Sequence, residues 1–204
     1  MLNNVLILSP HQDDEALGCG GLITSEKAFQ VHVRYYNNVH TSVSYSIYTR
    51  EAQEVAELGK FEVSVSPLTG VNHLVMYSIS EFITDIENTI NEIKPEYLFI
   101  PMCSRNQDHQ IIFDAARVAI RPHDKIHFVK NVYIYEQPEY TDQIFIPNTY
   151  LEIDIDKKIE LFGCYKTQHR SYRTDEHLRY LAGLRGLQCG VPFAEAYQSI
   201  RTMI

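Results

Sequence analysis

Two short clusters of histidine and acidic residues in this sequence have the types and spacing of a metal site. The first reads His-Gln-Asp-Asp-Glu from position 11, and the second is Asp-His at positions 108 and 109. A catalytic zinc takes three protein ligands and keeps a fourth position open. His11, Asp14 and His109 could supply those ligands, while Asp13 could accept a proton from an attacking water. Spacing alone leaves the reverse assignment open, with Asp13 as the ligand and Asp14 as the base.

Each cluster follows a segment with the pattern of a buried strand. Residues 5–10 and 97–101 are short apolar runs, as in strands that are covered on both faces. In the common doubly wound order 3-2-1-4-5, the first and fourth strands are neighbours, and ligands bind at their carboxyl ends. We therefore expect the two clusters to face each other across that crevice. Taken alone, either cluster would also suit a helix start, and Asp108 has the character of an N-cap residue.

The rest of the chain alternates between strand and helix patterns. This alternation indicates an α/β fold: a Rossmann-like, doubly wound, mostly parallel sheet with helices on both faces. Further strands are expected at 30–36, 61–66, 132–135 and 149–155, and helices at 15–29, 45–60, 78–94 and 108–120. Gly59 is expected to end the second helix, and the chain from residue 156 onward is expected to be helical. No linker or repeat interrupts the pattern, so we expect one domain over residues 1–204.

Composition and charge exclude several classes of protein. The 204 residues carry 26 acidic and 18 basic side chains, a net charge of -8, without any basic run, which argues against nucleic-acid binding. The carboxylates after the first strand would repel a phosphate, which excludes a dinucleotide site. Four scattered cysteines without a C-x-x-C pair argue against a structural zinc site and a disulfide framework. Since no apolar run has membrane length and no signal peptide is evident, we expect a cytoplasmic protein without a membrane span.

The motifs resemble those of the LmbE-like, or PIG-L, family of zinc-dependent N-acetylglucosaminyl deacetylases. Residues 10–15 are similar to the family signature P-H-P-D-D-E, and Asp108-His109 is similar to the end of its H-P-D-H motif. The resemblance continues, in the expected order, through Arg50-Glu51 with Ala56, Leu58 and Gly59, and through Arg185-Gly186 and Ala194-Glu195-Ala196.

By position, the resemblance implies that His11, Asp14 and His109 bind Zn²⁺ or another divalent metal, and that Asp13 is the general base. Arg50 falls on an arginine that binds substrate in family members. Asn106 stands where many members have a histidine that assists the oxyanion or the leaving group, so it is a further substrate-binding candidate. An amide donates a hydrogen bond but no proton at neutral pH. Asp13 would therefore act first as base and then as acid.

The resemblance implies an N-deacetylase, a zinc-dependent hydrolase that removes the N-acetyl or another N-acyl group from a small-molecule amino sugar such as an N-acetylglucosamine derivative. Gln12 replaces the usual proline, and Asn72 and His73 lie where an acidic sugar-binding residue is common, so the sugar itself stays open. A homo-oligomer is compatible with the sequence. One alternative is a magnesium-dependent phosphoryl hydrolase, which two histidines disfavour because magnesium prefers oxygen ligands. The other is a catalytically silent relative that binds a sugar or a metal.

Overall fold

One mixed sheet forms the centre of the computed structural model, which describes residues 2–28, 30–37, 45–68, 74–122, 126–138 and 145–203. Its strands in these ranges are β1 (Val5–His11), β2 (Val31–Asn37), β3 (Glu62–Val65), β4 (Tyr97–Pro101), β5 (Asn131–Tyr135), β6 (Thr149–Glu152) and β7 (Ala194–Arg201). They lie in the order β3-β2-β1-β4-β5-β7-β6. The first five strands are parallel, whereas β7 runs antiparallel to both β5 and β6.

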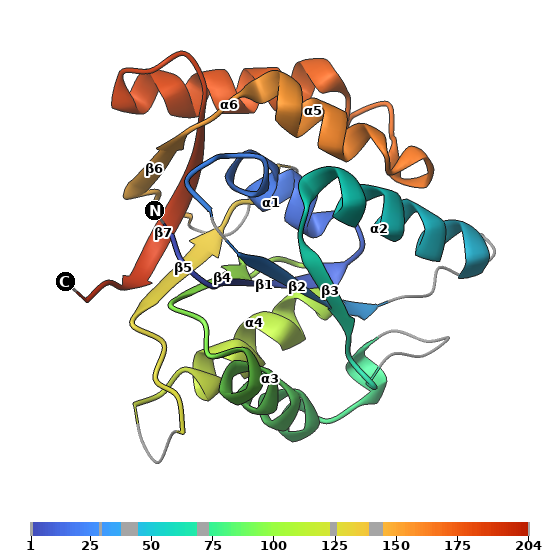
Figure 1. Cartoon of the computed structure of the whole chain (residues 1–204), viewed down its shortest axis with the longest axis vertical. Helices are drawn as coiled ribbons and strands as arrows, with labels where there is room; N and C mark the ends of the chain where they lie inside the picture. Colours follow the sequence, from blue (N-terminus) through green and yellow to red (C-terminus); the bar gives the residue numbers. More distant parts are fainter. Residues whose placement is uncertain are drawn as a thin grey trace.

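Helices cover both faces of this sheet (Figure 1). They are α1 (Asp14–Ile23), α2 (Tyr45–Gly59), α3 (Ile79–Ile93), α4 (Gln107–Ala119), α5 (Ile155–Gly163) and α6 (Asp175–Cys189), with short 3-10 turns η1 (Leu74–Met76) and η2 (Lys166–Gln168). Figure 1 shows α1, α2, α5 and α6 on one side of the strands and α3 and α4 on the other. The expected doubly wound architecture and the order 3-2-1-4-5 of the parallel strands are thus confirmed.

The alternating side chains of β1 explain why its apolar run lacks polar positions. Val5 and Ile7 belong to the core under α1, α2 and α5, whereas Leu6 and Leu8 belong to the core under α3 and α4. All four are fully buried. A central strand of this kind leaves only its carboxyl end open, and that end carries His11.

Three expectations about single elements were wrong: the end of the first helix, the cap of α4 and the helical character of the chain after residue 156. The first helix ends at Ile23 rather than near residue 29, because Thr24 and Ser25 turn their hydroxyls onto the last helical carbonyls. The second helix ends at Gly59 as expected, although Lys60 rather than Gly59 takes the left-handed conformation, with φ of 53°. Asn106 rather than Asp108 caps α4, through an Oδ1 that accepts from the Asp108 amide at 2.9 Å. The chain after residue 156 is not wholly helical, since it returns to the sheet as β7.

Two glycines let α1 lie directly against the strands beside it. A methyl group on Gly18 would overlap the ring of Tyr135 on β5, and one on Gly21 would overlap the side chain of Ile153. The absence of side chains at these two positions therefore permits the close packing of α1. This packing fixes the position of the first turn of α1, where the acidic residues lie.

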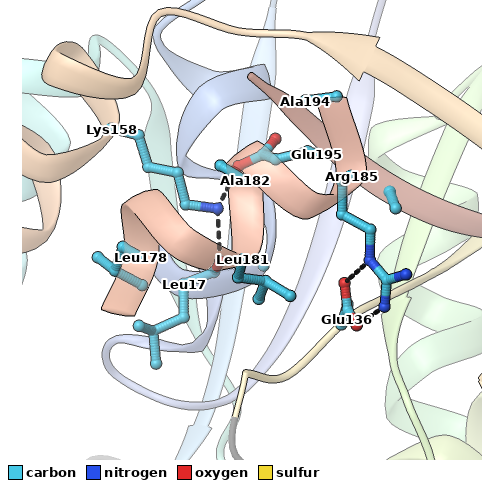
Figure 2. A pocket seen from close by; sticks show the side chains of 11 residues that line it. Leu17, Glu136, Lys158, Leu178, Leu181, Ala182, Arg185, Ala194 and Glu195 are labelled. Carbon is cyan, nitrogen blue, oxygen red and sulfur yellow. Dashed lines mark hydrogen bonds and ion pairs between the residues drawn. The ribbon is translucent and has the colours of Figure 1, made fainter. Parts of the chain in front are cut away.

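A buried ion pair ties α1 to the C-terminal part of the chain (Figure 2). Nζ of Lys158 on α5 lies 2.6 Å from Glu195 Oε1 on β7 and also donates to the Leu17 carbonyl at 2.7 Å. The Glu195 carboxylate accepts from the amides of Gly21 and Leu22 at 2.7 and 2.9 Å. In a regular helix the Gly21 amide would donate to the Leu17 carbonyl. Here Lys158 donates to that carbonyl and Glu195 accepts from that amide.

None of the helices in the described ranges has both the length and the apolar character needed to cross a membrane.

Candidate metal centre

Three donor atoms from separate parts of the chain converge at the carboxyl end of the sheet. Asp14 Oδ2 lies 3.3 Å from His11 Nδ1 and 3.2 Å from His109 Nε2, and the two imidazole nitrogens are 3.1 Å apart. In a tetrahedral zinc site with bonds of about 2.0–2.1 Å, neighbouring ligand atoms are about 3.3 Å apart. The three atoms thus have the spacing of one face of such a site. We call these residues the His-Asp-His cluster.

The strand order explains why residues so distant in sequence meet. His11 is the last residue of β1 and Asp14 the first of α1, while His109 lies in the first turn of α4, directly after the neighbouring strand β4. His109 and Asp14 are buried, with exposed fractions of 2% and 3%, and the His11 side chain is 27% exposed. His11 is therefore the member of the cluster that solvent reaches.

Asp108 supports the His11 ring from the side opposite to the cluster. Its Oδ2 lies 3.1 Å from His11 Nε2, and its Oδ1 accepts from the Leu74 amide at 2.9 Å. A carboxylate on the second ring nitrogen fixes the tautomer that presents Nδ1 to a metal. Burial alone would lower the pKa of His11, but the hydrogen bonds with Asp108 and Asp14 outweigh it and raise the pKa to about 10. The same carboxylates that favour a proton on His11 would also favour a metal cation, which would displace that proton on binding.

Asp14 is held in its ionised form. Burial would raise its pKa, but the charge and hydrogen bond of His109, together with His11, hold the pKa far below its usual range. Oδ2 also accepts from the His11 amide at 2.8 Å, and Oδ1 accepts from Gln137 Nε2 at 3.1 Å. Since Asp14 Oδ2 points into the cluster, the geometry favours Asp14 over Asp13 as the metal-binding carboxylate.

Asp13 lies beside the cluster without joining it. Its backbone has φ of 144° and ψ of -23°, a conformation that L-residues rarely adopt, at the turn between β1 and α1. Arg173 Nη1 lies 2.5 Å from Asp13 Oδ2. Burial and the neighbouring Asp14 raise the pKa of Asp13 well above its usual range, against the opposing effect of Arg173 and His11. A buried carboxyl whose pKa is raised by such neighbours has the properties of a general base.

Glu15 anchors the turn that carries these residues. Its Oε2 accepts from the Ser9 hydroxyl at 3.0 Å and from the Asp13 amide at 3.3 Å, and its Oε1 accepts from the Tyr165 hydroxyl at 2.6 Å. Burial raises the pKa of Glu15 to about 7, although the Tyr165 hydrogen bond opposes the rise. Glu15 thus has a structural explanation within the turn and is not one of the cluster donors.

The two expected substrate-binding residues have different places in the fold. Arg50 is exposed on α2, and no contact recorded within the described ranges links it to the His-Asp-His cluster. Asn106 caps α4 with its carbonyl oxygen, so a role for its amide group toward substrate stays a prediction. Asn72 and His73 lie outside the described residues.

Sequence reasoning missed three residues of the site: Asp108 as the partner of His11, Gln137 as the partner of Asp14, and Arg173 as the partner of Asp13. For Asp108 a signal existed, because it adjoins His109 and carboxylates often orient histidine ligands. Gln137 follows strand β5, whose carboxyl end opens on the same crevice. Arg173 gave no comparable signal.

The sequence matches the PIG-L family model, described as GlcNAc-PI de-N-acetylase, over residues 6–120. This range includes the whole His-Asp-His cluster and Asp13, and it ends before Arg173. No curated protein sequence gives a significant match to the chain.

Solved structures share the fold along nearly the whole chain. A conserved protein from Thermus thermophilus superposes with a TM-score of 0.80 at 18% identity, covering 100% of this chain and 97% of that one. N,N'-diacetylchitobiose deacetylase from Pyrococcus horikoshii has a TM-score of 0.78 at 20% identity, with 96% and 83% covered. GalB, the 4-carboxy-2-hydroxymuconate hydratase from Pseudomonas putida, has a TM-score of 0.78 at 20% identity, covering 100% of this chain and 98% of that one. At these identities the likeness shows the fold alone.

Proposed function

Since this chain belongs to the PIG-L family of GlcNAc-PI de-N-acetylases, we propose that it hydrolyses the N-acetyl group of a small amino-sugar substrate in a metal-dependent reaction. The observation that carries the proposal is the convergence of His11, Asp14 and His109 within 4.8 Å of one another, at the crevice where this fold class binds ligands. Two imidazoles and one carboxylate suit zinc better than magnesium. We therefore propose Zn²⁺ as the metal.

In this proposal the side chains have separate tasks. The cluster holds the metal, which would supply a Lewis acid that polarises the amide carbonyl and activates water for attack. Asp13 accepts the proton of the attacking water and then donates it to the departing amine, which the raised pKa of this carboxyl supports. The Asn106 amide donates a hydrogen bond to the substrate, and Arg50 positions the sugar from the first turns of α2. The products are a free amino sugar and acetate.

Acetate release from N-acetylglucosamine and N,N'-diacetylchitobiose tests the proposal. The purified protein, stripped with a chelator and reloaded with zinc, should regain the activity that chelation removes, with about one metal ion per chain. His109→Ala should bind no metal and release no acetate, because two ligands do not hold a catalytic zinc. His177→Ala is the matched control, since His177 lies on α6 outside the cluster, at an exposed hydrogen bond with Thr174.

Two results would contradict the proposal. Zinc binding without acetate release from any N-acetylated sugar would support the alternative that the protein is a catalytically silent relative that binds a sugar or a metal. Hydrolysis of a phosphate ester in magnesium, with no activity in zinc, would support the phosphoryl hydrolase instead.

A further inference from the structure

A partly buried arginine from the C-terminal part of the chain holds the residue proposed as the base. Arg173 Nη1 lies 2.5 Å from Asp13 Oδ2, and the two side chains are only 13% and 5% exposed. A guanidinium keeps its charge at every physiological pH. Breaking such a pair leaves an uncompensated charge away from water. The contact is therefore a fixed part of the site, unlike an exposed ion pair on the surface.

The segment that carries Arg173 is fastened to the site at two further points. This segment, residues 164–174 between α5 and α6, is called here the α5–α6 connection. The Tyr165 hydroxyl donates to Glu15 at 2.6 Å, and Thr167 donates through its amide and its hydroxyl to Glu51 at 3.0 and 2.5 Å. Both acceptors are buried carboxylates. These anchors hold the first part of the α5–α6 connection against α1 and α2, and Arg173 follows in its second part.

Asp13 needs such support, because its local structure does not orient its carboxylate. The residue occupies the N-cap position of α1, yet its side chain caps no helical amide, and its φ of 144° lies outside the usual regions. Among the residues that the structure describes, Arg173 is the hydrogen-bond partner of this carboxylate. It engages Oδ2 and leaves Oδ1 to exchange a proton.

We propose that Arg173 is a positioning residue that fixes the Asp13 carboxylate beside the His-Asp-His cluster. The inference rests on the proposed function, in which Asp13 transfers the proton. Arg173 acts through Asp13 and contributes no donor to the metal. The residue that positions the general base thus lies outside residues 6–120, the range that the family model matches.

The test compares Arg173→Ala and Arg173→Lys with Arg179→Ala, which removes an arginine from an exposed ion pair with Asp156 on the neighbouring helices. In the cobalt-loaded or zinc-loaded enzyme, Arg173→Ala should lower kcat for acetate release about 10²-fold with little change in KM, as a misplaced group does. The kcat of Arg173→Lys should lie between that of Arg173→Ala and that of the wild type.

Millimolar guanidinium chloride should restore part of the rate of acetate release in Arg173→Ala and should not raise the rate of the other variants. Cobalt content, read from the visible absorption, should stay at the wild-type level, and Arg179→Ala should behave as wild type.

Other outcomes overturn the inference. An unchanged kcat, or a loss that guanidinium does not relieve, would show that Arg173 does not hold the base. Loss of cobalt together with activity would make Arg173 a support of the metal centre itself. If the wild type releases no acetate, the proposed function fails, and crystal structures then decide: the Asp13 carboxylate should turn away from its wild-type position in Arg173→Ala, and an unmoved carboxylate would refute the inference.

Discussion

Asp108 is the residue that joins the two halves of the metal centre. Its carboxylate reaches His11 from the start of α4 and is itself fixed by the Leu74 amide. A histidine ligand whose second nitrogen is held in this way keeps its ring direction before a metal arrives. The site is therefore organised by a residue that does not belong to the cluster.

Asp108→Ala should weaken zinc binding by about 10–100-fold, the usual effect of removing the partner of a histidine ligand. The loss follows because the His11 ring would no longer be held with Nδ1 toward Asp14. Competition with a chromogenic chelator measures the affinity. Asp114→Ala, on the same helix, is the control and should bind zinc as the wild type does. Equal affinities in both variants would contradict the role of Asp108.

Asp13→Asn should keep zinc while acetate release collapses. The variant retains the shape of the side chain but removes the oxygen that accepts a proton, and general base catalysis is worth about 10²–10⁴-fold. A loss near the upper end is expected, because Asn106 cannot supply the missing proton. Metal content and rate measured on the same preparation decide the point. If zinc leaves together with activity, the roles of Asp13 and Asp14 are exchanged.

At the scale of elements, α1 is the helix whose packing the site depends on. Gly18→Ala should destabilise the protein by about 1–3 kcal/mol, because its methyl group would overlap Tyr135 on the adjacent strand. Gly163→Ala is the matched control: a methyl group there meets nothing within 4 Å at the end of α5, and alanine favours the helix by up to about 1 kcal/mol. Urea unfolding measures both. Equal stability of the two variants would show that α1 does not need this close approach.

The elements that sequence could predict are those whose own residues determine them. Strands β1 and β4 are continuous apolar runs, and the helices have clear boundaries such as Ser78, which caps α3. Strand β7 escaped prediction because Ala194, Glu195 and Ala196 favour helices in isolation. Its strand conformation comes from pairing with β5 on one side and β6 on the other, and pairing between distant segments leaves little trace in local sequence.

The same distinction applies to the site. His11, Asp14 and His109 were predictable as neighbours, because strand order alone brings the ends of β1 and β4 together. The contact between Asp13 and Arg173 was not predictable, since it depends on how the α5–α6 connection passes the first turn of α1. The unusual backbone conformation of Asp13 could not be predicted either, because an aspartate at this position does not by itself indicate a positive φ.

At the scale of the whole molecule, the buried pair of Lys158 and Glu195 links the first helix to the last strand. Lys158→Met should destabilise the protein by about 3–5 kcal/mol, because it leaves the Glu195 charge without its cationic partner in the interior. Adding Glu195→Gln should recover part of that loss. Arg179→Met, which breaks an exposed pair, should cost less than about 1 kcal/mol. Calorimetric or urea unfolding gives all the values, and a loss as small in Lys158→Met as in Arg179→Met would contradict this role of the pair.

The place of β7 between β5 and β6 also has a consequence for the order in which the chain is made. A ribosome releases the donors of the metal centre early, with His109 near the middle of the chain, but β6 has no neighbour in the sheet until β7 follows it. Until then β5 is an open edge, of the kind that pairs with other chains, and the amides of Gly21 and Leu22 lack the Glu195 carboxylate. A nascent chain that pauses before residue 194 would therefore expose β5 at the moment when aggregation is easiest. Synonymous codons that slow translation just before this strand should lower the soluble yield, although they change no residue of the protein.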